Sequence, residues 1–341
     1  MAELAEFETH RSRLWAVAYR ITGSVADADD AVQEAWLRWQ SLPDDVADEP
    51  RAYLTTIVSR ICYDQLNSAR SRRETYIGPW LPEPVLDGAG RVALGHGDDA
   101  PSPEDRVTLD ESVGMALLTV LERLTPAERT AFVLHDVFAV PFPEIAEVVG
   151  RTPDAVRQLA SRARRHVRAE APRRSVDKGE HRRAVDAFLH AVTGGDFEGL
   201  LKVLDPHVVW RSDGGGKVRA ARRPVFGQDK VARMAHAISR RFEPERMRLS
   251  PREVNGAPGL VFVDHVGRQV GVLAFTVGEG GRITEIDVVV NPDKLRHLDL
   301  DALSGDPDAL SGDPEGLSGS PEELSGDPDG PAGASGDPDG V

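Results

Sequence analysis

The stretch from Leu124 to Arg168 reads LTPAERTAFVLHDVFAVPFPEIAEVVGRTPDAVRQLASRARRHVR, and it decides how the middle of the chain folds. Thr125 is followed by proline and, three residues later, by Glu128. This pattern is a capping box with proline at the first helical position. It predicts a helix from Pro126 to about Phe138.

Two further helices are expected after this one. Pro141 ends the first helix, and a short second helix is predicted for Pro143 to Val149. Gly150 can adopt the left-handed turn that ends a helix, Thr152 is a good N-cap, and Pro153 suits the first turn of a third helix. Three helices with these turns predict a helix-turn-helix.

The third predicted helix has two different faces. Apolar residues recur at helical spacing and should point inward: Val156, Leu159, Ala160, Ala163 and Val167. Six arginines lie between residues 151 and 168, and such a density indicates contacts with phosphates and base edges in a major groove. The alternative is a basic amphipathic helix exposed to solvent. The candidate DNA-contacting residues are Arg151, Thr152, Asp154, Arg157, Gln158, Ser161, Arg162 and Arg165.

The stretch resembles region 4 of bacterial RNA polymerase sigma factors. This resemblance implies that the third helix reads the upstream (−35) promoter element.

An earlier segment, residues 14–40, contains two tryptophans on a predicted helix. Asp27, Asp29 and Asp30 favour the positively polarised N-terminal end of that helix. The apolar stripe is Ala28, Val32, Ala35, Trp36 and Trp39, for which core packing is the simpler account, although the tryptophans could also form part of a partner-binding rim. The run DADDAVQEAWLRW resembles sigma region 2.2. By that resemblance the contacts with core RNA polymerase are Asp30, Gln33, Glu34 and Arg38.

The next predicted helix begins at Pro50 and ends in a basic cluster. Leu54, Ile57, Val58, Ile61 and Cys62 should point inward, with Cys62 as a small buried hydrophobic residue. The cations at its end could simply complement a helix C-terminus. Similarity to sigma regions 2.3 and 2.4 implies instead that this helix binds melted −10 promoter DNA. The candidate residues are Arg60, Asp64, Asn67, Arg70, Arg72 and Arg73.

Residues 75–109 are rich in proline, glycine and aspartate, and they read as a linker. The prolines around Trp80 stiffen the backbone and present the aromatic ring to a partner surface. In sigma factors the corresponding linker is threaded towards the polymerase active-site cleft. A helix is expected to resume from Asp110 to Leu124.

The C-terminal part of the sequence has a different pattern of predicted elements from the helical part before it. Helices are expected for His181–Val192 and for Gly227–Phe242, and GGDFEGLLKVL reads as a loop followed by another helix. Strands are expected for HVVWRSD and for residues 247–254, 259–265, 269–277 and 282–290. Helices followed by antiparallel strands indicate an α+β domain. The element order resembles the SnoaL-like cone fold.

Three short motifs sharpen the resemblance. DGGGK is not a Walker A loop, because Arg211 replaces its first glycine and Val218 its Ser or Thr. With WLPEP and NPDKL it matches extracytoplasmic-function sigma factors that carry a fused SnoaL-like domain, which implies regulation in cis. We expect DGGGK and NPDKL to lie close together and to contact the sigma core or its linker. The residues are Trp80, Leu81, Pro82, Asp213, Gly214, Gly215, Gly216, Lys217, Asn291, Pro292, Asp293, Lys294 and Leu295.

Composition places limits on the remaining possibilities. The chain has no apolar run of membrane-spanning length and no apolar segment typical of a signal peptide near its start, so we expect a soluble cytoplasmic protein. One cysteine and scattered histidines predict neither a disulfide nor a zinc site, and no cofactor is expected.

The net charge of −15 includes twelve acidic residues after residue 298, and without them the rest of the chain carries −3. The LSGDP repeats of this tail predict an extended, disordered segment that could compete with nucleic acid for the basic helix.

The predicted architecture is multidomain. It comprises an all-α sigma region 2 (1–74), the linker (75–109), an all-α region 4 with the helix-turn-helix (110–172), an α+β SnoaL-like cone domain (177–298) and a disordered acidic tail (299–341). The predicted function is that of a sigma factor that makes and breaks no bond, and that is a monomer when free.

Two rivals remain open. One is a SnoaL-like enzyme with acid–base residues among Asp287, His207, His265 and Asp264. In a variant of this rival, the pocket of the SnoaL-like domain senses a ligand without catalysis and the helix-turn-helix acts as its regulator. The other rival is a plain helix-turn-helix repressor, which would bind duplex DNA without polymerase.

Overall fold

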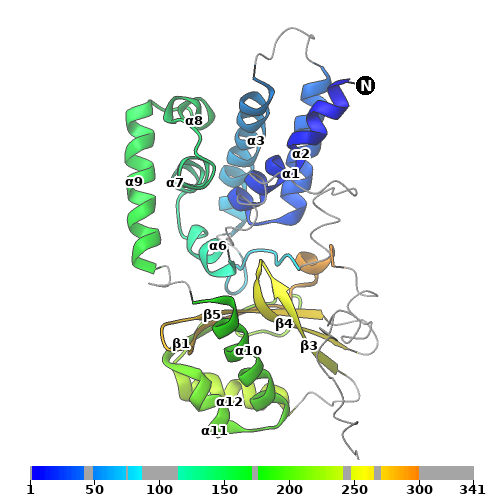
Figure 1. Cartoon of the computed structure of the whole chain (residues 1–341), viewed down its shortest axis with the longest axis vertical. Helices are drawn as coiled ribbons and strands as arrows, with labels where there is room; N and C mark the ends of the chain where they lie inside the picture. Colours follow the sequence, from blue (N-terminus) through cyan, green and yellow to red (C-terminus); the bar gives the residue numbers. More distant parts are fainter. Residues whose placement is uncertain are drawn as a thin grey trace, which may run out of the picture. The chain divides into compact units, whose positions relative to one another are not determined.

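The computed structural model describes residues 2–41, 49–73, 76–86, 114–170, 176–240, 247–264 and 270–298. The chain begins with three helices, α1 (Ala2–Thr22), α2 (Val25–Gln40) and α3 (Pro50–Arg73) (Figure 1). The Ser24 hydroxyl accepts a hydrogen bond from the backbone N–H of Asp27, which caps α2 at its first turn. Cys62 is buried on α3, as its position in the apolar stripe predicted.

The second helical group contains α6 (Met115–Leu121), α7 (Pro126–Phe132), α8 (Phe142–Val149) and α9 (Pro153–Glu170). The capping box at Thr125 and the left-handed Gly150 are both present, as the sequence predicted. The single helix expected up to Phe138 is wrong. A π-helix replaces its second half at Val133–Val137 because the Phe138 N–H reaches back five residues to the Val133 carbonyl at 3.2 Å.

Two other boundaries differ from expectation. Helix α8 begins at Phe142, one residue before the predicted Pro143. The helix expected from Asp110 to Leu124 is observed as α6 and ends at Leu121, while residues 110–113 lie outside the described residues.

The two helical groups share one hydrophobic core. Leu14, Ile21 and Leu54 from the first group belong to the same buried cluster as Leu134 and Ile145 from the second. The Arg13 guanidinium also donates to the Phe138 carbonyl at 3.0 Å. The predicted DNA-reading helices α3 and α9 are therefore held on a common base.

The described residues of the C-terminal part form a six-stranded sheet with the order β2-β1-β6-β5-β4-β3. β1 pairs parallel with β6, and the other neighbouring pairs are antiparallel. The strands are β1 (Leu204–Asp213), β2 (Val225–Phe226), β3 (Met247–Val254), β4 (Ala257–Asp264), β5 (Val270–Val277) and β6 (Ile283–Val289). The helices are α10 (Lys178–Thr193), α11 (Phe197–Val203) and α12 (Gln228–Ser239), and a 3-10 turn, η2, spans Pro292–Leu295.

Alternation along the strands gives the sheet two different faces. Leu260, Phe275 and Ile286 point into one cluster with residues of α10, α11 and α12. These three helices cover one face of the sheet (Figure 1). Val261 and Val289 point to the opposite face, into a cluster that also holds linker and α6 residues. Helices on one side of a mostly antiparallel sheet are the α+β architecture predicted for a SnoaL-like domain.

Two expectations from composition concern membrane-spanning segments and the acidic tail. No helix among the described residues is long and apolar enough to cross a membrane. The acidic repeats of residues 299–341 lie outside the described residues.

Candidate nucleic-acid interface and linker clamp

Helix α9 presents the predicted basic face to solvent. Val156, Leu159, Ala160 and Ala163 are buried, whereas the eight predicted DNA-contacting residues from Arg151 to Arg165 are all exposed. Arg157 pairs with Asp154 one turn earlier, and the Arg162 guanidinium lies 3.2 Å from a Glu128 carboxylate oxygen. Both arginines are exposed, and the pair of Arg157 with Asp154, in which both side chains are exposed, contributes little to stability, so Arg157 can exchange carboxylate for phosphate at low cost.

Helix α3 also presents its predicted polar face. Arg60, Asp64 and Asn67 are exposed, while the apolar residues of the helix pack inward. The backbone of α3 continues to Arg73, but the side chains predicted at its basic end, those of Arg70, Arg72 and Arg73, lie outside the described residues.

The two candidate DNA-reading helices line one groove of about 510 Å³. Tyr63 and Asn67 of α3 form one wall, and Arg151, Gln158 and Arg162 from α9 and the turn before it form the other. The structure thus brings together residues that the sequence had assigned to two different promoter elements.

Helix α2 carries the predicted polymerase-binding residues on one exposed face. Asp30, Gln33, Glu34 and Arg38 are all exposed, and Glu34 pairs with Arg38. Leu37 lies on the same helix with 58% of its surface exposed. The aromatic rim considered for this face is smaller than expected, because Trp39 is 9% exposed and packs against Tyr53.

The linker residues 76–86 are clamped on the sheet at Asp213, the last residue of β1. The fully buried Asp213 carboxylate accepts hydrogen bonds from the Tyr76 hydroxyl, from the Leu81 N–H at 2.9 Å and from the Lys294 ammonium at 2.8 Å. We call Asp213, Asn291 and Lys294 the linker clamp. It consists of residues from DGGGK and NPDKL, which the fold places together.

Lys294 completes the clamp from the 3-10 turn after β6. Its ammonium donates to the Leu81 carbonyl as well as to Asp213, and it lies 3.4 Å from the centroid of the Trp80 ring. One cation therefore contacts a backbone carbonyl, a carboxylate and an aromatic face. Leu81 itself is fully buried, so the linker is held by its backbone as well as by its side chain.

Asn291 explains why DGGGK has glycine at position 215. The Asn291 amide donates to the Tyr76 hydroxyl at 2.9 Å and lies directly against Gly215, where a β-carbon would overlap it. Gly215 and Gly216 have φ of 60° and 73°, in the left-handed region that favours glycine. Lys217 pairs with Asp293, so the turn is joined to NPDKL a second time.

Glu83, within WLPEP, joins the linker to the helical core. Its carboxylate accepts from the Val25 N–H at 2.7 Å and from the Ser24 hydroxyl at 3.0 Å, at the first turn of α2. The Tyr19 hydroxyl donates to the Glu83 carbonyl at 2.6 Å, and Asn255 of the β3–β4 turn donates to that hydroxyl at 2.7 Å. The linker therefore lies between α1, α2 and the sheet.

Burial shifts several pKa values at these contacts. Desolvation raises the pKa of Glu83, although hydrogen bonds from Val25 and Ser24 oppose the shift. Desolvation lowers the pKa of Lys294, and Asp213 opposes that shift. Burial, together with the hydrogen bond to Asp213, raises the pKa of Tyr76. The clamp is thus a buried charged network in which each charge depends on a partner.

Of the acid–base residues considered for an enzyme, the two whose side chains the structure describes, Asp287 and His207, are not brought together. Asp287 is buried in an ion pair with Arg211 at 2.6 Å, and Thr119 of α6 donates to it at 3.3 Å. The His207 side chain is 94% exposed. His265 and the side chain of Asp264 lie outside the described residues.

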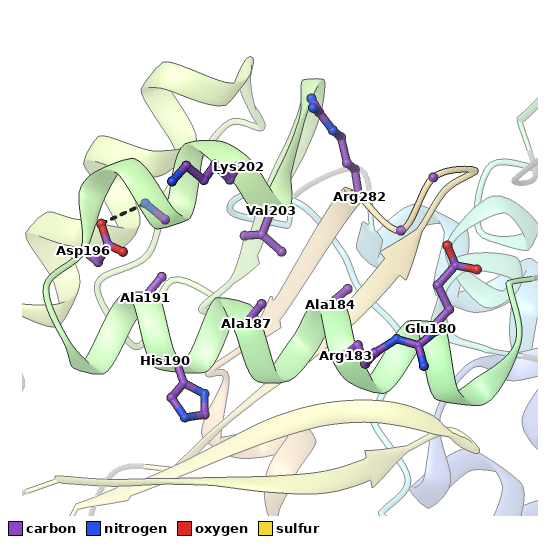
Figure 2. Close-up of a pocket in the computed structure, with 13 residues that line it drawn as sticks. Glu180, Arg183, Ala184, Ala187, His190, Ala191, Asp196, Lys202, Val203 and Arg282 are labelled. Carbon is purple, nitrogen blue, oxygen red and sulfur yellow. Dashed lines mark hydrogen bonds between the residues drawn. The ribbon is translucent and has the colours of Figure 1, made fainter.

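A second groove, of about 710 Å³, lies between α10, α11 and the β5–β6 turn. Its floor includes Ala184, Ala187 and Ala191, and charged residues form its rim. Figure 2 shows that these side chains do not converge: Arg183 extends towards Glu180, and Arg282 points away from α10. This arrangement does not form a converging set of ligand-binding groups.

Comparison with known proteins decides the family. Residues 7–72 match the model of Sigma-70 region 2, and residues 114–167 match that of Sigma-70, region 4. The ECF RNA polymerase sigma factor SigJ of Mycobacterium tuberculosis is 44% identical over 300 residues, which cover 86% of this chain and 93% of the relative. The chain belongs to the ECF RNA polymerase sigma factors.

Two further relatives agree. The probable ECF RNA polymerase sigma factor SigI of M. tuberculosis is 38% identical over 294 residues, which cover 85% of this chain and 94% of the relative. The crystal structure of M. tuberculosis SigJ matches with a TM-score of 0.68 at 40% identity, covering 87% of this chain and 99% of that structure. This protein is therefore an alternative sigma factor with a C-terminal SnoaL-like domain.

Sequence reasoning missed one residue at the centre of this sigma factor. Arg129 is 2% exposed, and its guanidinium donates to the Ile21 carbonyl of α1 at 2.9 Å and to the Leu121 carbonyl of α6 at 2.9 Å. It also pairs with Glu122 at 2.7 Å. Arg129 thus links region 2 to region 4. The available signal was an arginine on the face of α7 that also carries the buried Phe132.

Proposed function

We propose that this sigma factor binds core RNA polymerase through α2, melted −10 DNA through α3 and the −35 element through α9. The exposed polar faces of these helices support the proposal, because each is backed by a buried apolar face that fixes its direction. In this proposal the factor acts in the cytoplasm, is a monomer when free and catalyses no reaction.

We further propose that the SnoaL-like domain regulates the factor in cis by holding the linker. The observation that carries this proposal is the double attachment of WLPEP. Asp213 and Lys294 bind both backbone groups of Leu81, while Glu83, two residues later, caps α2. The clamp therefore connects the sheet to the helical core through a segment of three residues.

The groove between α3 and α9 supports the idea that linker attachment controls the separation of the two DNA-reading regions. Promoter elements centred about 25 base pairs apart lie about 85 Å apart along B-DNA at 3.4 Å per base pair. Residues of α3 and α9 that line one groove of about 510 Å³ cannot reach two elements at that separation. The two regions must separate to read a promoter, and the buried clamp opposes that separation.

Run-off transcription with core polymerase tests the whole proposal. The chain is expected to initiate at a specific start site, and deletion of residues 175–341 is expected to change promoter-dependent transcription. Failure to associate with core polymerase would exclude the sigma-factor assignments of α2, α3 and α9.

A point variant isolates the clamp. Asp213→Asn removes the charge that pairs with Lys294, and it is expected to expose the linker to proteases and to raise run-off transcription severalfold. Asp229→Asn, which removes an exposed carboxylate paired with Arg233, is the matched control and should change neither. Equal transcription by both variants would show that linker attachment does not regulate the factor.

A further inference from the structure

A basic loop of the SnoaL-like domain remains without a role in the proposed function. Residues 217–223 read KVRAARR, with four cations and no acidic residue, in a chain whose net charge is −15. Arg219, Arg222 and Arg223 are exposed in irregular backbone between β1 and β2. Among the described residues, no carboxylate lies within ion-pair distance of these three arginines, in contrast to Lys217, which pairs with Asp293.

The loop has a defined conformation because its first turn is fixed. Gly214 has no room for a β-carbon, which would lie 2.5 Å from the Val218 carbonyl oxygen. The Lys217 N–H donates to the Gly214 carbonyl at 3.0 Å, and the left-handed glycines turn the chain outward. The arginines therefore extend from an anchored base, which reduces the entropy lost when they bind.

The loop lies close to the end of the proposed −10 helix. A β-carbon on Gly78 would lie 3.8 Å from the Arg222 α-carbon, and one on Gly216 would lie 2.9 Å from the Ile77 side chain. Four residues lie between Arg73, the last residue of α3, and Gly78, and the five Cα–Cα steps span at most about 17 Å. DNA bound at the end of α3 would therefore have backbone phosphates within a few nucleotides of Arg222.

An exposed aromatic residue completes the surface. Phe226 follows Arg223 by three residues on the edge strand β2, with 62% of its surface exposed. Cations beside an exposed aromatic ring are the combination that binds single-stranded nucleic acid, because phosphates pair with the cations and a base stacks on the ring. The bases of a duplex are already stacked on one another, so a duplex would gain no stacking contact with this ring.

We infer that the loop Lys217–Phe226 is a third DNA-binding surface that holds the single strand leaving the −10 region, with Arg219, Arg222 and Arg223 on phosphates and Phe226 under a base. The inference rests on the proposed binding of melted DNA by α3. It gives the SnoaL-like domain direct contact with the promoter, in addition to its contact with the linker.

The test uses full-length protein assembled with core polymerase and a fluorescent, pre-melted promoter, with affinity measured between 50 and 200 mM salt. Loss of three single-strand phosphate contacts in Arg219→Gln/Arg222→Gln/Arg223→Gln should reduce the slope of log K against log salt by about 2. Phe226→Ala should weaken binding about 5- to 150-fold with little change in slope. Thermal unfolding should be unchanged in both, since all four side chains are exposed.

A charge-matched control uses cations of the same domain around the other groove, Arg183→Gln/Lys202→Gln/Arg282→Gln. An equal change of slope in this control and in the loop variant would show a general charge effect and overturn the inference. A loop variant that weakens assembly with core polymerase, while the holoenzyme keeps its salt slope on DNA, would assign the loop to the polymerase instead.

Failure of the inference is distinguishable from failure of the proposed function. If wild-type holoenzyme shows no preference for the promoter, the proposed function is wrong. If wild type shows that preference and the loop variants bind like wild type, only the third surface is excluded.

Discussion

The two faces of the SnoaL-like sheet are covered by different chemistry. One face carries Leu260, Phe275 and Ile286 against the domain's own helices. The hydrophobic effect that stabilises this face is non-directional, so it does not require a particular partner. The other face carries Arg211, Asp213 and Asp287, which are buried among apolar residues beneath the linker and α6. Buried charges require particular partners at particular distances. The apolar face gives the domain its stability, and the charged face determines which segment docks on it.

The largest effect is expected from breaking the charged face. Lys294→Met leaves the Asp213 carboxylate buried without its cation, and it should lower the free energy of unfolding by about 3–5 kcal/mol. Hydrogen exchange at the Leu81 amide, which donates to Asp213, should accelerate more than exchange in α10. Urea unfolding with hydrogen exchange measures both quantities.

A double variant separates charge from packing. In Asp213→Leu/Lys294→Met no unpaired charge remains, so the free energy of unfolding should return close to that of wild type. The Leu81 amide should still exchange rapidly because its acceptor has been removed. Slow exchange at Leu81 in this variant would show that apolar contacts alone hold the linker.

A substitution on the apolar face of the sheet should lower the stability without releasing the linker. Leu260→Ala removes a fully buried side chain and should cost about 2–5 kcal/mol, with a cavity left behind. Under native conditions the protection of the Leu81 amide from hydrogen exchange, relative to the amides of α10, should remain unchanged because the linker clamp is intact. A selective loss of protection in the linker would contradict the proposed independence of the two faces.

Among the single substitutions of buried residues, the smallest effect is expected at Glu83. Glu83→Gln weakens a side-chain acceptor at the N-terminus of α2 and should cost about 1 kcal/mol. Burial raises the pKa of Glu83 above its ordinary 4.5, so the folded state binds this proton more tightly than the unfolded state. The Glu83 contribution to stability is therefore complete below about pH 4.5 and falls as the pH rises through the raised pKa.

Unfolding measured from pH 4.5 to pH 7 checks this sign. The stability difference between wild type and Glu83→Gln should shrink as the pH rises through that window. Glu279→Gln, at an exposed position of the β5–β6 turn, provides the matched control and should give a constant difference. A difference that grows with pH would show that the charged form of Glu83 is favoured in the folded protein.

Local sequence signals predicted helix α9 correctly and gave no indication of the π-helix. Thr152, Pro153 and the apolar spacing of α9 act over a few residues, so they can be recognised without knowing the rest of the fold. The π-helix depends on hydrogen bonds that span five residues, such as that from the Phe138 N–H to the Val133 carbonyl, and the Arg13 guanidinium of α1 binds the Phe138 carbonyl just beyond it. That contact comes from a residue 125 positions away, which no local pattern encodes.

The clamp shows a different limit. DGGGK, WLPEP and NPDKL could be singled out by resemblance, but the pairing of Asp213 with Lys294 joins residues 81 positions apart through the parallel β1–β6 pair. Glu83 was not singled out within WLPEP, and Arg129 was missed, because each looks like an ordinary exposed charge in sequence. Only the packed structure reveals that they satisfy backbone groups of another segment.

The position of Glu83 has one further consequence. The helix turn that it caps, at Val25 and Ala26, opens the helix that carries Asp30, Gln33, Glu34 and Arg38. In the proposed function α2 binds core polymerase, so withdrawal of the linker would remove an acceptor from the first turn of the helix that makes this contact. Any coupling between linker release and polymerase binding through this turn is reciprocal: release changes the affinity for polymerase by the same factor by which polymerase changes the equilibrium for release.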